Sequence, residues 1–220
     1  MNAQVSGTAE HQASAAKDQG VKNDVTVCTN PASCEVIAIY PIHTLEDVKN
    51  AVTNARRAQP AWQALPLKKK IAYVKKFAEY IQKNSAKLAE IISQDNGKTI
   101  FDAMFAEVGP ATLATSYYCK NAAEFLADRK LKAGNIMLMN KRSRIVRVPY
   151  GVVGIISPWN YPFAIPFSEV VMGLLAGNAV VLKPAELTPL TPPEVRSRIT
   201  ATTVAPRSTT LDPGRPRAAP

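Results

Sequence analysis

The sequence has 220 residues, a formal net charge of +10 and 46% hydrophobic residues. This length suits one or two globular domains, and no apolar run approaches the roughly 18 residues of a membrane span, so we expect no membrane partner. A basic charge is typical of proteins that bind nucleic acids. However, the lysines at 68–76 lie at helical spacing opposite an apolar face, so we interpret them as a solvated helix surface and expect no nucleic-acid partner.

Residues 1–24 are polar and carry neither the apolar core of a signal peptide nor the arginine bias of a transit peptide, so we expect a disordered tail. The odd number of cysteines favours a reducing compartment and predicts a cytoplasmic protein. We interpret Cys28, Cys34 and Cys119 as small apolar residues, with a Cys28–Cys34 disulfide as the alternative. The two histidines stand alone in the sequence, which predicts no metal site.

Two runs rich in β-branched residues, 25–29 and 35–40, flank a proline-containing turn and predict a β-hairpin. Thr44 and Asp47 follow with the spacing of a capping box, in which each side chain accepts a hydrogen bond from the backbone N–H of the other residue. A helix is therefore expected to begin at this point.

The next segment is predicted to be almost entirely helical. A second helix begins at Pro66, which suits a first turn, and runs to Asn96, where a glycine follows. A third helical stretch runs from Thr99 to about Asp128 and contains Pro110 as the expected position of a kink.

A second hairpin is expected after these helices, with strands at 136–139 and 144–148 around a turn at 141–143. No internal repeat is visible. Residues 25–148 are therefore predicted to form a scaffold of hairpins and helices.

Residues 149–188 are the most informative segment, because they predict one strand–helix–strand unit. The run 152–157 is apolar and mostly β-branched, as in a strand buried in a parallel sheet, and 179–183 has the same character. Between them, Pro166 suits the first turn of a helix that Gly177 ends. This helix is expected to cover one sheet face only and to leave a strand edge open to association. Its apolar face recurs at helical spacing in Phe167, Val170, Val171, Leu174 and Leu175.

Ligands of such sheets bind beyond the carboxyl ends of the strands. One strand is followed by Trp159, Asn160 and Tyr161, and the other ends at Lys183 with Glu186 close behind. Each residue also has an ordinary interpretation, because asparagine is common in turns, aromatic rings pack, and charges near strand ends are often only solvated. The sequence contains no G-x-G-x-x-G, so it lacks the ordinary dinucleotide fingerprint.

Three motifs in this segment occur together: P-W-N-Y-P after the first strand, A-G-N at the end of the helix, and V-L-K-P-A-E at the second strand. In order and spacing they resemble the aldehyde dehydrogenase superfamily. Weaker similarity reaches back to about residue 25 through T-N-P-A-S-C-E-V, P-A-W-Q-A-L-P and N-G-K. The resemblance implies an α/β fold that contains the N-terminal portion of the family: an incomplete, Rossmann-like doubly wound domain beside the helical scaffold and β-hairpins.

The resemblance implies specific roles at the strand ends. Asn160 matches the residue whose side-chain amide donates to the oxyanion that forms when a thiolate adds to an aldehyde carbonyl. Lys183 and Glu186 match the pair that binds the adenosine ribose hydroxyls of the nicotinamide cofactor. Because a glutamate at that position repels a 2′-phosphate, NAD is favoured over NADP.

Other matched positions line the ligands of the family. Those at the cofactor are Ile156, Ser157 and Trp159, together with Asn160. Those at the aldehyde tunnel are Tyr161, Ile165 and Ser168. Glu169 departs from the lysine that many members carry, so we assign it no proton-relay role. The implied partners are a small-molecule aldehyde and further copies of the chain, since the hairpin at 136–148 matches the arm through which family subunits form homo-oligomers.

Aldehyde oxidation in the family also needs a cysteine nucleophile and a glutamate general base, in downstream motifs that this sequence lacks. Residues 189–220 contain seven prolines, five arginines and no lysine, without a family pattern. We interpret this tail as a frameshift or an early chain end, with a genuine Pro/Arg-rich linker as the alternative. The prediction is NAD(P)-dependent oxidation of an aldehyde to a carboxylic acid by family, with this chain truncated and inactive. A noncatalytic NAD-binding or subunit-interaction fragment is the alternative.

Overall fold

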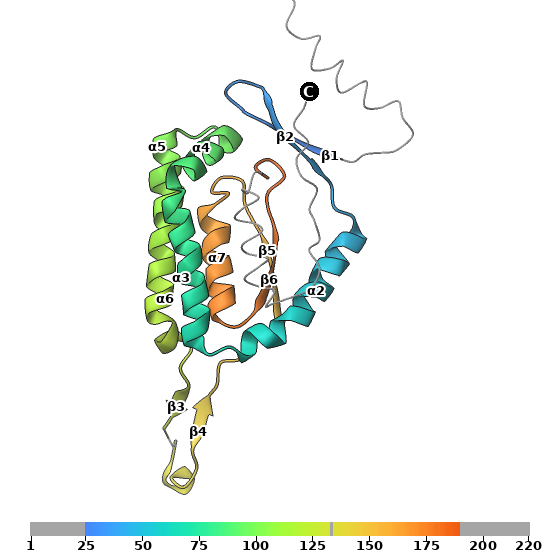
Figure 1. Cartoon of the computed structure of the whole chain (residues 1–220). Helices are drawn as coiled ribbons and strands as arrows, with labels where there is room; N and C mark the ends of the chain where they lie inside the picture. The colour runs from blue at the N-terminus through green and yellow to red at the C-terminus, as the bar shows by residue number, and fades with distance from the viewer. Residues whose placement is uncertain (1–24, 133, 190–220) are drawn as a thin grey trace, which may run out of the picture.

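The computed structural model describes residues 25–132 and 134–189 (Figure 1). The predicted disordered tail at 1–24 and the Pro/Arg-rich segment from 190 onward lie outside the described residues. In chain order the elements are β1 (Val25–Thr29), β2 (Val36–Pro41), α2 (Leu45–Ala64), α3 (Leu67–Lys83), α4 (Ser85–Asn96), α5 (Ile100–Asp102), the π-helix η1 (Ala103–Val108), α6 (Gly109–Phe125), β3 (Arg129–Leu131), the 3₁₀ turn η2 (Ile136–Leu138), β4 (Ser143–Ile145), β5 (Val152–Ile156), α7 (Ala164–Leu175) and β6 (Ala179–Lys183).

The first predicted hairpin is confirmed, because β1 and β2 pair antiparallel. Asn30 closes the turn through two hydrogen bonds. Its backbone N–H donates to the carbonyl oxygen of Glu35 at 2.8 Å, and its side-chain oxygen accepts from the N–H of Ala32 at 2.9 Å. Cys28 and Cys34 are both free thiols, so the alternative of a disulfide across this hairpin is wrong.

The capping box at the start of α2 is also confirmed. The Thr44 hydroxyl accepts from the N–H of Asp47 at 3.2 Å, and the Asp47 carboxylate accepts from the N–H of Thr44 at 2.8 Å. This hydrogen bond from the Thr44 backbone, helped by one from the Thr44 hydroxyl, holds the pKa of Asp47 below its ordinary value of 3.8. The ionised carboxylate therefore stabilises the helix start.

We expect Asp47→Ala to lower the stability of the protein at neutral pH and to lose this effect in acid. Because the folded pKa lies below 3.8, the stabilisation is complete above 3.8 and disappears as the pH falls through the lower folded value. Urea unfolding of both proteins between about pH 7 and about pH 2 measures the difference, and the two midpoints should converge. A difference that does not change with pH would show that the carboxylate charge plays no part.

The helix predicted from Pro66 to Asn96 is in fact two helices, α3 and α4, and the prediction of one was wrong. Asn84 separates them. Its side-chain amide donates to the carbonyl oxygen of Tyr80 at 2.8 Å, and its backbone N–H is shared between the carbonyls of Tyr80 and Ile81. This side chain competes with the helical hydrogen-bond ladder, which breaks at that point.

The long helical stretch beginning after Thr99 is confirmed as continuous, but it contains a π-helical segment instead of a simple kink. The segment η1 ends at Val108, two residues before Pro110, which lies in the first turn of α6. The N–H of Gly109 donates to the carbonyl oxygen of Met104, five residues back. Because proline has no N–H and its ring crowds the preceding turn, the ladder widens just before it.

The second hairpin forms from different residues than predicted. β3 pairs antiparallel with β4, whereas Ile136 and Met137 belong to a 3₁₀ turn at the exposed tip. The base is fixed by Arg144, whose guanidinium lies 2.9 Å from the Asp128 carboxylate, and by Arg147, which donates to the carbonyl oxygen of Ala127 at 2.8 Å. The prediction of a strand at 136–139 was wrong because apolar residues usually indicate burial in a sheet, whereas Ile136, Met137 and Met139 lie in an exposed loop. Figure 1 shows this hairpin projecting from the rest of the chain.

The predicted strand–helix–strand unit is confirmed. β5 and β6 pair in parallel, with Val152 opposite Ala179 and Ile156 opposite Lys183, and α7 connects them. Gly177 ends α7 with a φ of +89°, which L-residues with a side chain rarely adopt. Among the described residues β5 and β6 pair only with each other, so each strand has an outer edge without a described partner strand.

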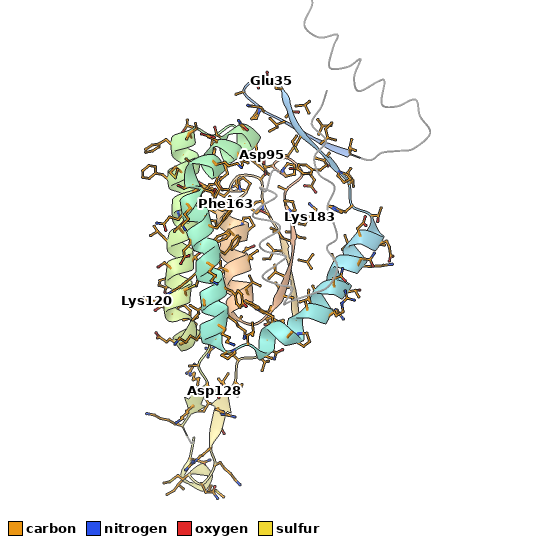
Figure 2. The ribbon with its side chains drawn as sticks, viewed as in Figure 1. Glu35, Asp95, Lys120, Asp128, Phe163 and Lys183 are labelled. Atoms are coloured by element: carbon orange, nitrogen blue, oxygen red, sulfur yellow. The ribbon has the colours of Figure 1, made fainter. Side chains whose placement is uncertain are left out.

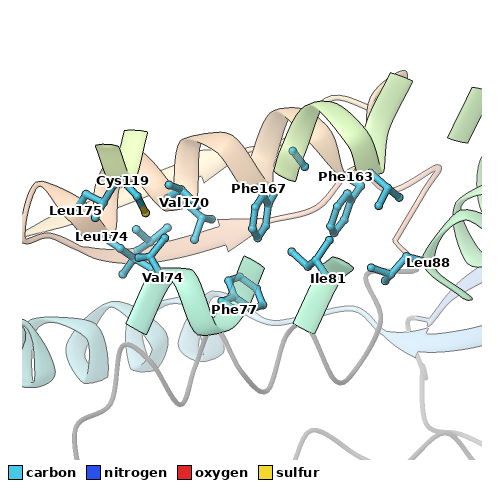
Figure 3. Packing of buried hydrophobic residues seen from close by; sticks show 14 of the residues in the cluster. Val74, Phe77, Ile81, Leu88, Cys119, Phe163, Phe167, Val170, Leu174 and Leu175 are labelled. Atoms are coloured by element: carbon cyan, nitrogen blue, oxygen red, sulfur yellow. The ribbon is translucent and has the colours of Figure 1, made fainter. Parts of the chain in front are cut away.

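The core surrounds α7, which packs against α3 and α6 and also against both strands. Figure 3 shows Phe77 of α3 beside Phe167 of α7, with their ring centroids 5.0 Å apart, and Phe163 stacked on Phe167 at 5.4 Å. At the opposite end of α7, Cys119 of α6 lies beside Leu175. These contacts place the start of α7 next to the helical scaffold.

As predicted, α7 covers one side of the strands, but the opposite side is not left open, because α2 contacts both β5 and β6. In Figure 1, α7 lies to the left of the strands and α2 to their right. Trp62 of α2 is 1% exposed, and its indole N–H donates to the carbonyl oxygen of Leu174 at 2.9 Å. Gln59 donates to the carbonyl oxygen of Gly177 at 3.0 Å. Two polar side chains of α2 thus hold the end of α7.

One of the lysines predicted to be solvated is buried instead. Lys70 is 8% exposed, and its ammonium donates to the carbonyl oxygen of Gln63 at 3.0 Å. Burial lowers the pKa of Lys70. Within the described part of the chain, no helix combines the length and apolar character that crossing a bilayer requires.

Candidate active-site turn and cofactor site

The parallel register of β5 and β6 brings the two predicted groups of site residues to the same edge of the sheet. Ile156 lies opposite Lys183, and the backbone N–H of Ser157 donates to the carbonyl oxygen of Lys183 at 2.9 Å. The turn that follows Ser157 therefore starts beside the end of β6. Figure 2 shows Phe163, where this turn enters α7, and Lys183 at the same end of the unit.

Asn160 lies in this turn, between two prolines, with its side chain exposed. No described residue forms a hydrogen bond with its side-chain amide, whereas the Asn30 amide in the first hairpin bonds its own turn. The ordinary interpretation of Asn160 as a residue that stabilises its own turn therefore has no hydrogen bond to support it. The amide is available to a ligand.

The turn is held in place by residues from other parts of the chain. The carboxylate of Glu107 accepts the backbone N–H groups of Phe163 at 2.8 Å and Ala164 at 3.1 Å, and it also pairs with the ammonium of Lys98. Lys98 in turn donates to the carbonyl oxygen of Asn160 at 2.5 Å. These contacts join the turn to η1 and to the loop after α4.

Sequence reasoning did not identify Glu107 or assign a role to Lys98. A signal for Glu107 was present, because it occupies the same buried face as Ala103, Ala111 and Thr115, four residues apart along the chain. A charged residue on the buried face of a helix is uncommon unless it has a partner. The N-G-K motif contains that partner, Lys98, but appeared only as part of the resemblance.

Lys183 and Glu186 form an ion pair just beyond β6. Their side chains are 52% and 73% exposed, so solvent and a ligand can reach both. The hydrogen bond from Lys183 lowers the pKa of Glu186, which keeps this carboxylate ionised and able to accept hydrogen bonds. The pair offers an ammonium donor and a carboxylate acceptor at one place on the surface.

The other predicted site residues differ in what they expose. Ile156 and Trp159 present apolar surface, with exposed fractions of 79% and 57%, whereas Ser157 is buried and its backbone N–H is engaged by the carbonyl oxygen of Lys183. Tyr161 lies below Lys98, whose ammonium is 4.3 Å from the ring centroid.

Ile165 and Ser168 lie on α7, close to the turn. Ile165 is partly exposed. The Ser168 hydroxyl donates to the carbonyl oxygen of Ala164 at 2.8 Å, so its hydrogen atom is engaged by the helix. Glu169 is exposed on the same helix. The tunnel roles of Tyr161, Ile165 and Ser168 stay predictions.

Neither buried cysteine is arranged as a reactive thiol. Burial, together with the charge of Asp95, raises the pKa of Cys28 to about 11. Burial also raises the pKa of Cys119. Cys119 lies at the Leu175 end of α7, about 18 Å from the start of the helix near Asn160 at about 1.5 Å per residue. Cys34 is exposed in the β1–β2 turn.

Comparison with known proteins finds similarity to one enzyme family. The family model described as "Aldehyde dehydrogenase family" matches residues 17–207. The curated protein 4,4'-diapolycopene aldehyde oxidase of Methylomonas sp is 33% identical over 158 residues, which cover 72% of this chain and 30% of that protein. A protein of Mycolicibacterium smegmatis, whose name gives succinate semialdehyde and NADP(+), is 36% identical over 153 residues, 70% of this chain and 29% of that protein.

Solved structures give the same relationship. The crystal structure of an NAD-dependent benzaldehyde dehydrogenase from Corynebacterium glutamicum superimposes with a TM-score of 0.72 at 30% identity. The match covers 83% of this chain and 39% of that one. The chain thus spans about 30% of the length of the curated relatives named above.

Proposed function

This chain belongs to the aldehyde dehydrogenase family, and we propose that its strand ends contribute a cofactor site and an oxyanion donor to NAD-dependent oxidation of an aldehyde to a carboxylic acid. The observation that carries the proposal is the parallel register of β5 and β6, which brings Asn160 and the Lys183–Glu186 pair to one sheet edge. Ligands of parallel sheets bind at this edge. Both groups are exposed there, as a binding function requires.

The Lys183–Glu186 pair has the chemistry to bind a ribose. The ammonium donates hydrogen bonds to hydroxyl oxygens, and the carboxylate accepts from hydroxyl hydrogens, so the pair matches a vicinal diol. The exposed side chain of Ile156 beside it supplies an apolar surface for the adenosine. When bound, NAD would supply the hydride acceptor of the reaction. The relatives include one named for NADP(+) and one named for NAD. We propose that Glu186 decides between the two cofactors in this chain, because its carboxylate repels the 2′-phosphate of NADP.

The Asn160 amide follows the end of β5 and makes no hydrogen bond to a described residue, as expected of an oxyanion donor. In the proposed reaction a thiolate adds to the aldehyde carbonyl, and negative charge develops on the carbonyl oxygen. An N–H group already fixed beside that oxygen is worth roughly 3 kcal/mol of the barrier. Tyr161, Ile165 and Ser168 follow within eight residues, which supports the proposal that the aldehyde approaches along this side of α7.

We expect Glu186→Gln to shift cofactor preference toward NADP. Removing the carboxylate charge removes its repulsion of a 2′-phosphate, so the NADP to NAD affinity ratio should rise about fivefold. Ligand titrations followed by NMR measure both affinities on the 220-residue chain. Glu169→Gln, which removes an exposed charge from α7, is the matched control and should leave the ratio unchanged. An unchanged ratio in Glu186→Gln would argue against the ribose assignment.

A role in subunit association is the second candidate, and the β3–β4 hairpin favours it. Ile136 and Met137 at the tip are 81% and 84% exposed, and Met139 is also exposed. Such apolar side chains on a projecting hairpin match a contact with another subunit. We propose homo-oligomer formation through this hairpin. Sedimentation of the parent and of Met137→Lys tests it, because a charge at the tip should weaken any association.

A further inference from the structure

The turn that carries Asn160 is fixed by a buried ion pair. The carboxylate of Glu107 is fully buried, with 0% of its surface exposed. One oxygen accepts the backbone N–H groups of Phe163 and Ala164, at 2.8 Å and 3.1 Å, and the other pairs with the ammonium of Lys98. Glu107 thus binds the point where the turn enters α7.

The same lysine contacts the middle of the turn. Its ammonium donates to the carbonyl oxygen of Asn160 at 2.5 Å and lies over the ring of Tyr161 at 4.3 Å. Nearby, the side-chain amide of Asn96 donates to the carbonyl oxygen of Trp159 at 2.9 Å. Three consecutive residues, Trp159, Asn160 and Tyr161, are therefore held by side chains from one short segment at the end of α4.

Helix stability alone is a poor explanation of this arrangement. Taking two charges out of water is costly, and apolar replacements of buried ion pairs are often as stable as the pair itself. What charged groups do supply is direction, because hydrogen bonds to a carboxylate or an ammonium are short and oriented. No local side chain caps the start of α7. Glu107, which is distant in sequence, instead provides the hydrogen-bond acceptor that a local capping residue normally provides. The π-helical segment η1 contains this carboxylate.

We propose that Lys98 and Glu107 are positioning residues that hold the turn so that the Asn160 amide faces the site at the strand ends. They act through the backbone of the turn and do not contact the aldehyde. The catalytic meaning of this inference rests on the proposed function, because an oxyanion donor acts through its preorganised orientation. The positioning itself is a property of the chain and is testable without substrate.

The test uses the two tryptophans, which report on different places. Trp159 lies in the turn, and Trp62 lies in the core on α2. The 220-residue chain labelled with 5-fluorotryptophan gives two ¹⁹F resonances, which Trp159→Phe assigns. In Lys98→Met the Trp159 resonance is expected to shift and broaden or split, while the Trp62 resonance stays unchanged.

Two further measurements make the result specific. The amide protons of Phe163 and Ala164 should exchange about tenfold faster in the double variant Lys98→Met/Glu107→Gln, the factor for one lost hydrogen bond of ordinary strength. This variant removes both charges, so it leaves no charge buried alone. Lys98→Arg keeps the charge and should restore the parent spectrum in part. Lys120→Met and Glu124→Gln, on the exposed surface of α6, are the matched controls and should change nothing.

A Trp159 resonance and amide exchange rates that match the parent in both Lys98→Met and the double variant would overturn the proposal. Loss of the Trp62 signal dispersion together with that of Trp159 would do so as well, because the pair would then support the whole fold and not the turn. NAD titration of the parent is scored separately. A turn that depends on Lys98 in a chain without affinity for NAD would contradict the proposed function and leave the positioning role standing.

Discussion

Replacing Trp62 by alanine is expected to lower the free energy of unfolding by about 3–5 kcal/mol. The side chain is 1% exposed, so truncation leaves a cavity between α2 and the crossover unit. It also removes the donor to the carbonyl oxygen of Leu174 and the ring contact with Tyr73, whose centroid is 5.8 Å away. Urea unfolding followed by circular dichroism measures the loss.

The second tryptophan provides the control. Trp159 is 57% exposed, and its contact with Asn96 uses its backbone carbonyl, which alanine retains. Trp159→Ala should therefore change stability by no more than about 0.5 kcal/mol. A loss in Trp62→Ala as small as that in Trp159→Ala would mean that α2 does not cover the strands in solution. It would also restore the expectation of a crossover covered on one side only.

The 220-residue chain is expected to oxidise no aldehyde above the rate without protein. The reaction needs a thiolate beside the oxyanion donor, and an oxyanion donor cannot replace it. Cys28 and Cys119 are buried with raised pKa values, which disfavours the thiolate. Cys119 is also separated from the Asn160 turn by the length of α7. NADH absorbance with several aldehydes measures the rate.

Turnover that Cys34→Ser or Cys119→Ser abolishes would reveal a nucleophile and contradict this expectation. Turnover that survives both substitutions would point to a contaminating enzyme. The rate at which each thiol reacts with a disulfide reagent distinguishes the three cysteines. Cys34 should react quickly with a disulfide reagent in the native chain, whereas Cys28 and Cys119 should react only on unfolding.

The crossover unit could be predicted from the sequence because its signals are local. Two apolar runs, a proline at a helix start and a glycine at its end each act within a few residues. Even the boundary at Ser157 differs little, since this residue lies just past β5 and still donates to the carbonyl oxygen of Lys183. The parallel pairing then followed from the length of the connection.

The elements that were predicted wrongly depend on individual side-chain contacts that hydrophobic periodicity does not record. The break at Asn84 depends on a side chain that competes for the carbonyl oxygen of Tyr80. The register of the second hairpin depends on Arg144 and its partner Asp128, sixteen positions apart. The burial of Lys70 depends on how α2 and α3 meet. The contact of Asn84 is local, four residues back along the chain, whereas the other two outcomes were decided by contacts between elements over local propensity.

The candidate site shows the same division. Lys183, Glu186 and Asn160 were predictable as neighbours because strand ends of a parallel sheet meet at one edge. Glu107 was not, because the backbone groups that it binds at Phe163 lie 56 residues away. The roles of all these residues in binding and catalysis remain predictions.

The most direct test of the account is to titrate the ¹⁵N-labelled chain with NAD and follow the backbone amide shifts. The account predicts changes concentrated at Ile156–Asn160 and at Lys183–Glu186, with a dissociation constant of about 1 mM, near 4 kcal/mol, because Lys183 and Glu186 bind only the ribose of the cofactor. Lys183→Met should weaken these changes, while Lys120→Met should not. Shifts confined to other parts of the chain, or shifts at the strand ends that Lys183→Met leaves intact, would contradict the assignment of this edge as the cofactor site.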